Sequence, residues 1–77
     1  MAGNLPQVRP REVIRVLESL GFQRIRQSGS HAAFRHPDGR WTTVSIHPSK
    51  TIPTGTLRKI IRDAGLTPEQ FVEMLRA

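Results

Sequence analysis

Hydrophobic residues recur at helical spacing in the first third of the chain. Val13, Leu17 and Leu20 are separated by four and then three residues, which places them on one side of a helix. Pro10 suits the first position of such a helix, and Gly21 suits the position just beyond its end. The pattern therefore predicts an amphipathic helix from Pro10 to Leu20.

Three runs in the middle of the chain predict β-strands. They are residues 22–28, residues 30–36 and residues 40–47, and turn residues separate each run from the next. In the first run, strict alternation places Arg24 and Arg26 on the same face, opposite Ile25. The second and third runs flank Pro37-Asp38-Gly39 and are expected to form a hairpin.

Side-chain alternation decides how the two hairpin strands pair. A two-residue turn would put the apolar residues of the two strands on opposite faces, whereas a three-residue loop puts them on the same face. We therefore expect Pro37-Asp38-Gly39 to form a three-residue loop, with Gly39 in a left-handed conformation. This register pairs Phe34 with Thr42 and Ala32 with Val44 on the face that packs against the core.

The same register predicts a second, open face that carries polar and aromatic side chains. On this face Arg35 is opposite Trp41, and His31 is opposite Ser45. His47 lies two residues beyond Ser45, so its side chain is expected to point to the same side.

Two more helices are predicted after the hairpin. An apolar stripe predicts a helix from about Gly55 to Ala64. Thr67 and Gln70 have the spacing of a capping box, and Pro68 between them suits the first position of a final short helix. The expected fold is α+β, with helices on one face of a three-stranded antiparallel sheet.

The length and composition restrict the classes of protein to which the chain can belong. Its 77 residues predict one small domain over residues 1–77, in which the non-periodic residues 1–8 are expected to be a flexible arm. The absence of cysteine excludes disulfides, thiolate metal sites and cysteine nucleophiles. We find no apolar run of membrane-spanning length and no secretion signal, so the cytoplasm is the expected compartment and no membrane partner is expected.

The charge of the chain suggests an anionic partner. Twelve Lys and Arg residues against six Asp and Glu residues give a net charge of +6, and ten of the twelve cations are arginine. Because the arginine fork matches the geometry of phosphate and carboxylate groups, this excess favours nucleic acid or an acidic protein as the partner.

The histidines are the main candidates for chemistry. His36 ends a strand beside a turn and is interpreted as a turn residue. His31 and His47 are expected to share the open face, where imidazole can act as a proton donor or acceptor near neutral pH. On residue types alone, however, a lone strand histidine is more often an ordinary surface residue than a catalytic one. No third ligand near these two histidines is evident, so neither a metal nor another cofactor is expected.

Trp41 permits two interpretations. It can stack a nucleobase on the open sheet face. Alternatively, it can form a cation–π pair with Arg35 or contact a protein partner.

Short motifs at the ends of the predicted elements form a pattern of their own. They are Leu20-Gly21-Phe22, Gly29-Ser30-His31, His36-Pro37-Asp38-Gly39, Val44-Ser45-Ile46-His47, Pro53-Thr54-Gly55-Thr56-Leu57-Arg58-Lys59-Ile60 and Ala64-Gly65-Leu66. In this order and at these spacings they resemble the HicA (YcfA-like) toxins of toxin–antitoxin systems, over residues from about Pro10 to Leu75.

This resemblance implies a fold, an activity and partners. The fold is the double-stranded-RNA-binding-domain-like α-β-β-β-α arrangement, here with a short C-terminal helix. The activity is metal-independent cleavage of mRNA, which arrests translation, and the histidine of Gly-Ser-His, His31, is the implied catalytic residue. The partners are an mRNA substrate and a HicB-type antitoxin, with DNA contacted only indirectly through the antitoxin.

The remaining candidate site residues surround His31. His47 and Ser30 are candidates for a second catalytic or phosphate-binding role. The candidate RNA-binding residues are Arg24, Arg26, Arg35, Trp41, Lys50, Thr54, Thr56 and Arg58. Two other functions are kept open: a non-catalytic RNA-binding module of the same fold, and a small interaction protein whose basic surface binds an acidic partner.

Overall fold

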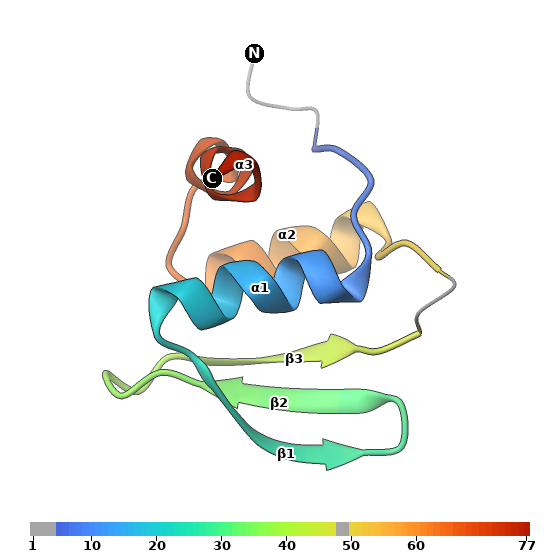
Figure 1. Cartoon of the computed structure of the whole chain (residues 1–77), viewed down its shortest axis with the longest axis vertical. Coiled ribbons are helices and arrows are strands. Elements are labelled where there is room, and N and C mark those ends of the chain that lie inside the picture. The colour runs from blue at the N-terminus through green and yellow to red at the C-terminus, as the bar shows by residue number, and fades with distance from the viewer. Residues whose placement is uncertain (1–4, 48–49) are drawn as a thin grey trace.

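The computed structural model describes residues 5–47 and 50–77. Along the chain these form α1 (Pro10–Leu20), β1 (Gln23–Ser28), β2 (His31–Arg35), β3 (Trp41–Ser45), α2 (Thr54–Asp63) and α3 (Pro68–Arg76) (Figure 1). The strands form one antiparallel sheet in the order β1-β2-β3. The structure confirms the expected α+β class, and its helix-sheet-helix order is consistent with the double-stranded-RNA-binding-domain-like arrangement.

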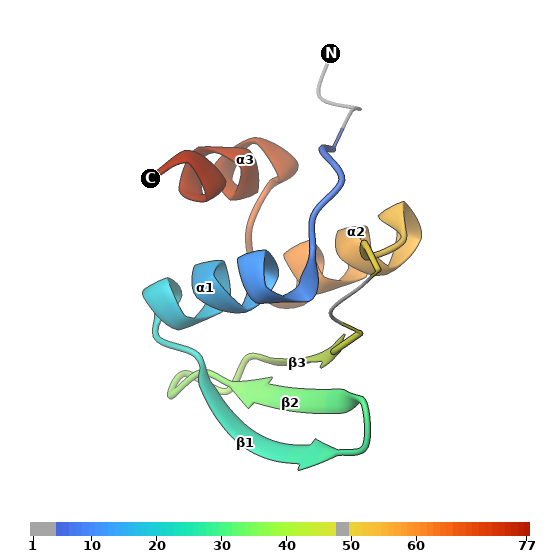
Figure 2. The same cartoon turned by 45° about the vertical axis from the view of Figure 1, so that its right-hand side comes forward.

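The helices all lie on one side of the sheet. Figures 1 and 2 show α1 and α2 side by side over this face, with α3 on the far side of the two helices. Helices α1 and α2 contact β3, and both also contact α3. All six residues of β1 are exposed, so the helices do not bury this edge strand. None of the described helices is long and apolar enough to cross a membrane.

The core fills the space between the helices and the inner face of β2 and β3. Phe34, in the middle of the central strand, has none of its surface exposed. Around it are the buried residues Val13, Val16 and Leu17 of α1, Ala32 and Val44 of the sheet, Leu57, Ile60 and Ile61 of α2, and Phe71 of α3. The apolar stripes predicted for α1 and α2 are therefore their buried faces.

The hairpin has the register expected from side-chain alternation. Phe34 is paired with Thr42, and the two open-face pairs predicted above, His31 with Ser45 and Arg35 with Trp41, are also present. The loop between the strands has three residues, because the His36 amide donates to the Arg40 carbonyl at 2.8 Å across it.

One expectation for β1 is wrong. Arg24 pairs with Phe34, whereas Arg26 pairs with Ala33, and the register shifts between them. Ile25 is therefore the extra residue of a β-bulge, and the two arginines face opposite sides of the sheet. Strict alternation predicted the same side because a bulge, which depends on the partner strand, is invisible in the local pattern.

The expected flexible arm does not extend to residue 8. Val8 is buried, and its carbonyl accepts a hydrogen bond from the Ile52 amide at 2.8 Å. Leu5 also packs against the core. Leu5 and Val8 of the expected arm therefore pack against the domain, where the segment before α2 helps to hold Val8, while residues 1–4 lie outside the described part of the chain.

A buried hydroxyl joins the sheet to α2. Thr42 is 1 % exposed, and its hydroxyl donates to Asp63 Oδ2 at 2.9 Å. The same carboxylate oxygen lies 2.8 Å from Lys59 Nζ, one turn earlier in α2. Because a buried hydroxyl without a partner is costly, this bond lets a threonine occupy a core position.

The glycine at the end of the hairpin loop gives a test of the fold. Gly39 has φ of +100°, and a Cβ added there would contact nothing, so Gly39→Ala isolates the backbone cost. We expect a loss of about 1–2 kcal/mol in the free energy of unfolding, seen as a lower midpoint in urea. Gly55, at the second position of α2, also has open space around it, so Gly55→Ala should instead stabilise by about 0.5–1 kcal/mol. Equal effects of the two substitutions would contradict this account of the loop.

Candidate functional site

His31 is the first residue of the central strand and lies on the open face. Its neighbours across the two strand pairings are Ser28 on β1 and Ser45 on β3, so a serine stands on each side of the histidine. The imidazole is exposed and makes no hydrogen bond or ion pair with any residue of the two described segments. Its nitrogens are therefore available to a ligand.

A second group of candidate residues lines a small cavity beyond the end of β3. Ser45, His47, Lys50 and Thr56 are among the residues that line it, and its volume is about 280 Å³. The Lys50 amide donates to the His47 carbonyl at 3.0 Å, so these two residues lie close together. The cavity therefore has an imidazole, an ammonium group and the first turn of α2 in its lining.

Ser45 connects this cavity to His31. It is the cross-strand partner of His31, and it also lines the cavity that contains His47. Directly opposed residues of an antiparallel pair have Cβ atoms about 5 Å apart. The two histidines are thus linked through one residue, with His31 on the open face and His47 in the cavity beyond the end of β3.

The rest of the open face is basic and carries one large aromatic ring. Arg26 and Arg35 are exposed on this face, opposite Ala33 and Trp41 respectively. Trp41 is 60 % exposed. In the described parts of the chain no arginine lies over its ring, since the cation–π contacts there belong to phenylalanines. The cation–π pair with Arg35 is therefore not formed, and the indole face is uncovered.

Two of the candidate RNA-binding residues lie away from His31. Arg24 faces the helical side of the sheet, where its guanidinium lies 5.4 Å from the centre of the Phe34 ring and donates to Gln27 at 2.9 Å. Arg58 lines a separate cavity between α2 and the start of α3, together with Leu66 and Pro68. The bulge explains the position of Arg24, and the helical period explains that of Arg58.

Ser30 and Thr54 have less distinctive surroundings. Ser30 lies in the turn between β1 and β2, and its carbonyl accepts a hydrogen bond from the Ile46 amide, which ties the turn to the end of β3. Thr54 is the exposed first residue of α2. The residue before it, Pro53, supplies no side-chain cap, so the first-turn amides of α2 receive no hydrogen bond from a capping side chain.

Sequence reasoning missed Ser28 as a neighbour of His31. The pairing of the two residues depends on the extra residue in β1, because without the bulge the register there would differ by one position. β1 is rich in arginine and glutamine, and its sequence contains no local signal that marks the bulge. Among the described residues there is also no group of three His, Cys, Asp or Glu side chains that could hold a metal ion.

His36 belongs to the hairpin loop, as its sequence position indicated. Its Nε2 lies 3.0 Å from the Leu20 carbonyl, and its Nδ1 accepts from the Asp38 amide at 3.1 Å. Since a carbonyl oxygen only accepts, Nε2 carries a proton and donates to it, while Nδ1 also lies 3.0 Å from Asp38 Oδ1. The ring also meets Phe22 edge to face, with the centroids 5.2 Å apart. Both nitrogens of His36 are thus committed to the fold, in contrast to those of His31.

Asp38 closes the same loop. Its carboxylate accepts from the Arg40 backbone amide at 3.1 Å and from Arg40 Nε at 2.8 Å. The Arg40 amide is the main cause that holds the pKa of Asp38 below its ordinary value of 3.8. The Arg40 guanidinium and the nearby His36 lower this pKa further, while partial desolvation opposes them.

Most of the chain matches a known protein family. Residues 10–66 match the model of a protein family described as the HicA toxin of bacterial toxin-antitoxin. This range begins at the first residue of α1, includes the whole sheet and α2, and ends just before α3. No protein in a search of the curated proteins matches the chain.

The loop that holds His36 has a predicted pH dependence. Since the pKa of Asp38 is lower in the folded chain, its stabilising effect is complete above 3.8 and is lost as the pH falls through the folded value. We expect the melting temperature of the wild type to fall more steeply than that of Asp38→Asn between pH 5 and pH 2.5. Glu73→Gln, which changes an exposed carboxylate of α3, is the control and should follow the wild type. Parallel curves for the wild type and Asp38→Asn would contradict the prediction.

Proposed function

Since the chain belongs to the HicA toxin family of bacterial toxin–antitoxin systems, we propose that it acts as a toxin by cutting mRNA and thereby arresting translation. The proposed reaction is the metal-independent cleavage of an internal phosphodiester bond. We further propose a HicB-type antitoxin as its protein partner, DNA as a contact only through that antitoxin, and the cytoplasm as its compartment.

The observation that carries this proposal is the free imidazole of His31. It is exposed, lies on a face with basic residues, and has no hydrogen-bond partner within the described residues. A general base must reach the proton that it removes. A histidine whose two ring nitrogens are both hydrogen-bonded within the protein cannot do so. His36 illustrates the difference, because the fold uses both of its ring nitrogens.

The chemistry needs a base, an acid and positive charge around one phosphate. In the proposed reaction His31 removes the proton of a ribose 2′-hydroxyl, whose oxygen then attacks the adjacent phosphorus. The bond from phosphorus to the 5′-oxygen breaks, and a second acid protonates that oxygen. The products are a 2′,3′-cyclic phosphate and a 5′-hydroxyl. His47 is the candidate for the acid, because its cavity adjoins the His31 pair through Ser45.

Positive charge and free amides support binding of the phosphate beside these histidines. Lys50 and Thr56 share the cavity with His47. The uncapped N-terminus of α2 adds amides and the favourable end of a helix dipole. Such groups stabilise the extra negative charge that develops on phosphorus in the transition state.

The open face beyond His31 supports contact with the bases of a single strand. Trp41 offers an uncovered ring to a base, and the exposed Arg26 and Arg35 offer charge to the backbone. Arg24 and Arg58 are left out of this RNA surface, since they lie elsewhere on the molecule.

Replacement of His31 gives the direct test. We expect His31→Ala to lower the rate of RNA cleavage about 100-fold or more, because it removes the base without filling or emptying the core. Cleavage of a purified mRNA would be followed by primer extension with EDTA present. Thr43→Ala, at an exposed position on the same face, is the matched control and should cleave like the wild type.

The outcomes separate the two functions that the open face permits. If His31→Ala folds, as judged by circular dichroism, and cleaves RNA at the wild-type rate, the proposed role of His31 is wrong. If the wild type binds RNA in a salt-dependent manner but never cleaves it, the protein is a binding module of the same fold.

Replacement of Trp41 tests the RNA surface separately from the chemistry. We expect Trp41→Ala to weaken binding of single-stranded RNA by about 1–3 kcal/mol, because one stacked base loses its platform. The effect should appear in KM and leave kcat close to that of the wild type, since Trp41 does not take part in proton transfer. A fall in kcat with unchanged KM would contradict base stacking by Trp41.

A further inference from the structure

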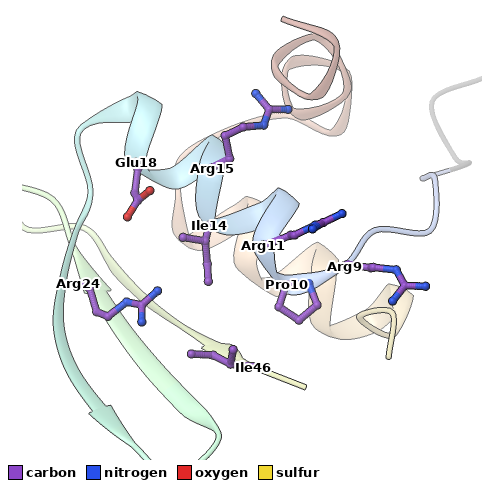
Figure 3. Close-up of a pocket in the computed structure, with 8 residues that line it drawn as sticks. All are labelled: Arg9, Pro10, Arg11, Ile14, Arg15, Glu18, Arg24 and Ile46. Atoms are coloured by element: carbon purple, nitrogen blue, oxygen red, sulfur yellow. The ribbon is translucent and has the colours of Figure 1, made fainter. Parts of the chain in front are cut away.

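A groove lies between α1 and the helical face of the sheet, on the opposite side from His31. Figure 3 shows Pro10 and Ile14 of α1 and Ile46 after β3 turned toward this gap, with Arg24 reaching toward it from β1. The groove has a volume of about 550 Å³. It exists because β1 projects past the helices, so that α1 covers only part of the inner face of the sheet.

The floor of the groove is aliphatic and its margin is cationic. Pro10, Ile14 and Ile46 supply the apolar surface, while Arg11 and Arg24 lie at the margin. Ile46 is only partly buried, so apolar surface is left uncovered within the groove. Glu18 also lines the groove and gives it one acidic position.

Arg24 is held in place before any ligand arrives. Its guanidinium lies 5.4 Å from the centre of the Phe34 ring and donates to the Gln27 side chain at 2.9 Å. A cation fixed in this way loses little conformational freedom when an anion binds. Arg15, which also lines the groove, instead donates to the Leu75 carbonyl at 2.8 Å and joins α1 to the end of α3.

These features fit a segment of a protein partner better than they fit RNA or a second copy. The groove lining includes no aromatic side chain on which an unpaired base could stack. A second copy of this chain would bring a net charge of +6 against another +6. An amphipathic acidic segment complements both the aliphatic floor and the cationic margin of the groove, because its apolar side chains cover the floor while its carboxylates pair with the arginines.

We propose that the groove between α1 and the sheet docks an acidic amphipathic segment of the antitoxin that pairs with this toxin. The proposal rests on the membership of a toxin–antitoxin family and holds whether or not His31 cleaves RNA. From Pro10 to Glu18 the groove follows about two turns of helix, so a segment of two to three turns would fill it. Glu18 favours a basic residue of the segment at that end.

Charge reversal tests the proposal on the folded chain. The probe is the HicB-type antitoxin proposed above as the partner of this chain, and its affinity for each variant is measured by calorimetry. We expect Arg11→Glu and Arg24→Glu each to weaken binding about tenfold or more. Arg62→Glu on α2 makes the same change in net charge outside the groove and should have less than about a threefold effect.

Isoleucine methyl signals locate the contact on the wild-type chain. On addition of the antitoxin we expect the methyl resonances of Ile14 and Ile46 to shift, while that of the buried Ile60 stays in place. Ile25, exposed at the bulge of the edge strand, reports on the main competing surface. Shifts at Ile25 without shifts at Ile14 and Ile46 would overturn the proposal in favour of docking along the edge of β1.

The other outcomes distinguish this proposal from the proposed catalytic function. His31→Ala should bind the antitoxin like the wild type, and Arg11→Glu should cleave RNA like the wild type. If the wild type cleaves no RNA but Arg11→Glu and Arg24→Glu still bind the antitoxin more weakly than the wild type does, the catalytic proposal fails and the docking proposal stands. It is overturned if the antitoxin does not bind the wild type, if Arg62→Glu weakens binding as much as Arg11→Glu, or if Arg11→Glu impairs RNA cleavage and leaves antitoxin binding unchanged.

Discussion

The alternation of side chains in the β2–β3 hairpin decides which residues form the core and which can meet a ligand. Phe34 and Val44 face the helices only because the loop has three residues and Gly39 adopts a positive φ. The same parity places His31 and Trp41 on the open face. A shift of one residue in one strand would expose Phe34 and bury Arg35, so the site and the core depend on a single register.

The core of so short a chain is small, and several side chains brace it at its margins. Arg40 is the most connected of these. Its guanidinium pairs with Asp38, lies over the Phe22 ring and donates to the carbonyl of Ala64 at the end of α2. One side chain thereby links the hairpin loop, the α1–β1 junction and the last turn of α2. This brace keeps the loop in the conformation that the register requires.

The sequence predicted the features that depend on local chemistry. The capping box of Thr67 and Gln70, the helical stripes and the loop ending in Gly39 all follow from residues close together in the chain. The features that it did not predict depend on distant partners. The bulge at Ile25 is a property of β1 and β2 together, and Val8 is buried in a core built from distant segments, one of which contains Ile52, whose amide donates to the Val8 carbonyl. Whether the ring nitrogens of a histidine are free or hydrogen-bonded likewise depends on distant groups, as the Leu20 carbonyl beside His36 shows.

The bulge has a consequence for both faces of the sheet. By turning Arg24 inward and leaving Arg26 outward, it gives each face of β1 one arginine. Charges on the two faces of a single sheet are separated by a distance comparable to the Debye length, about 8 Å at physiological ionic strength. Neutralisation of Arg24 by an acidic segment would therefore lower the positive potential near His31 as well as in the groove. A partner seated on the helical side can thus weaken the attraction of RNA for the open face without covering His31, and this effect should be largest at low salt.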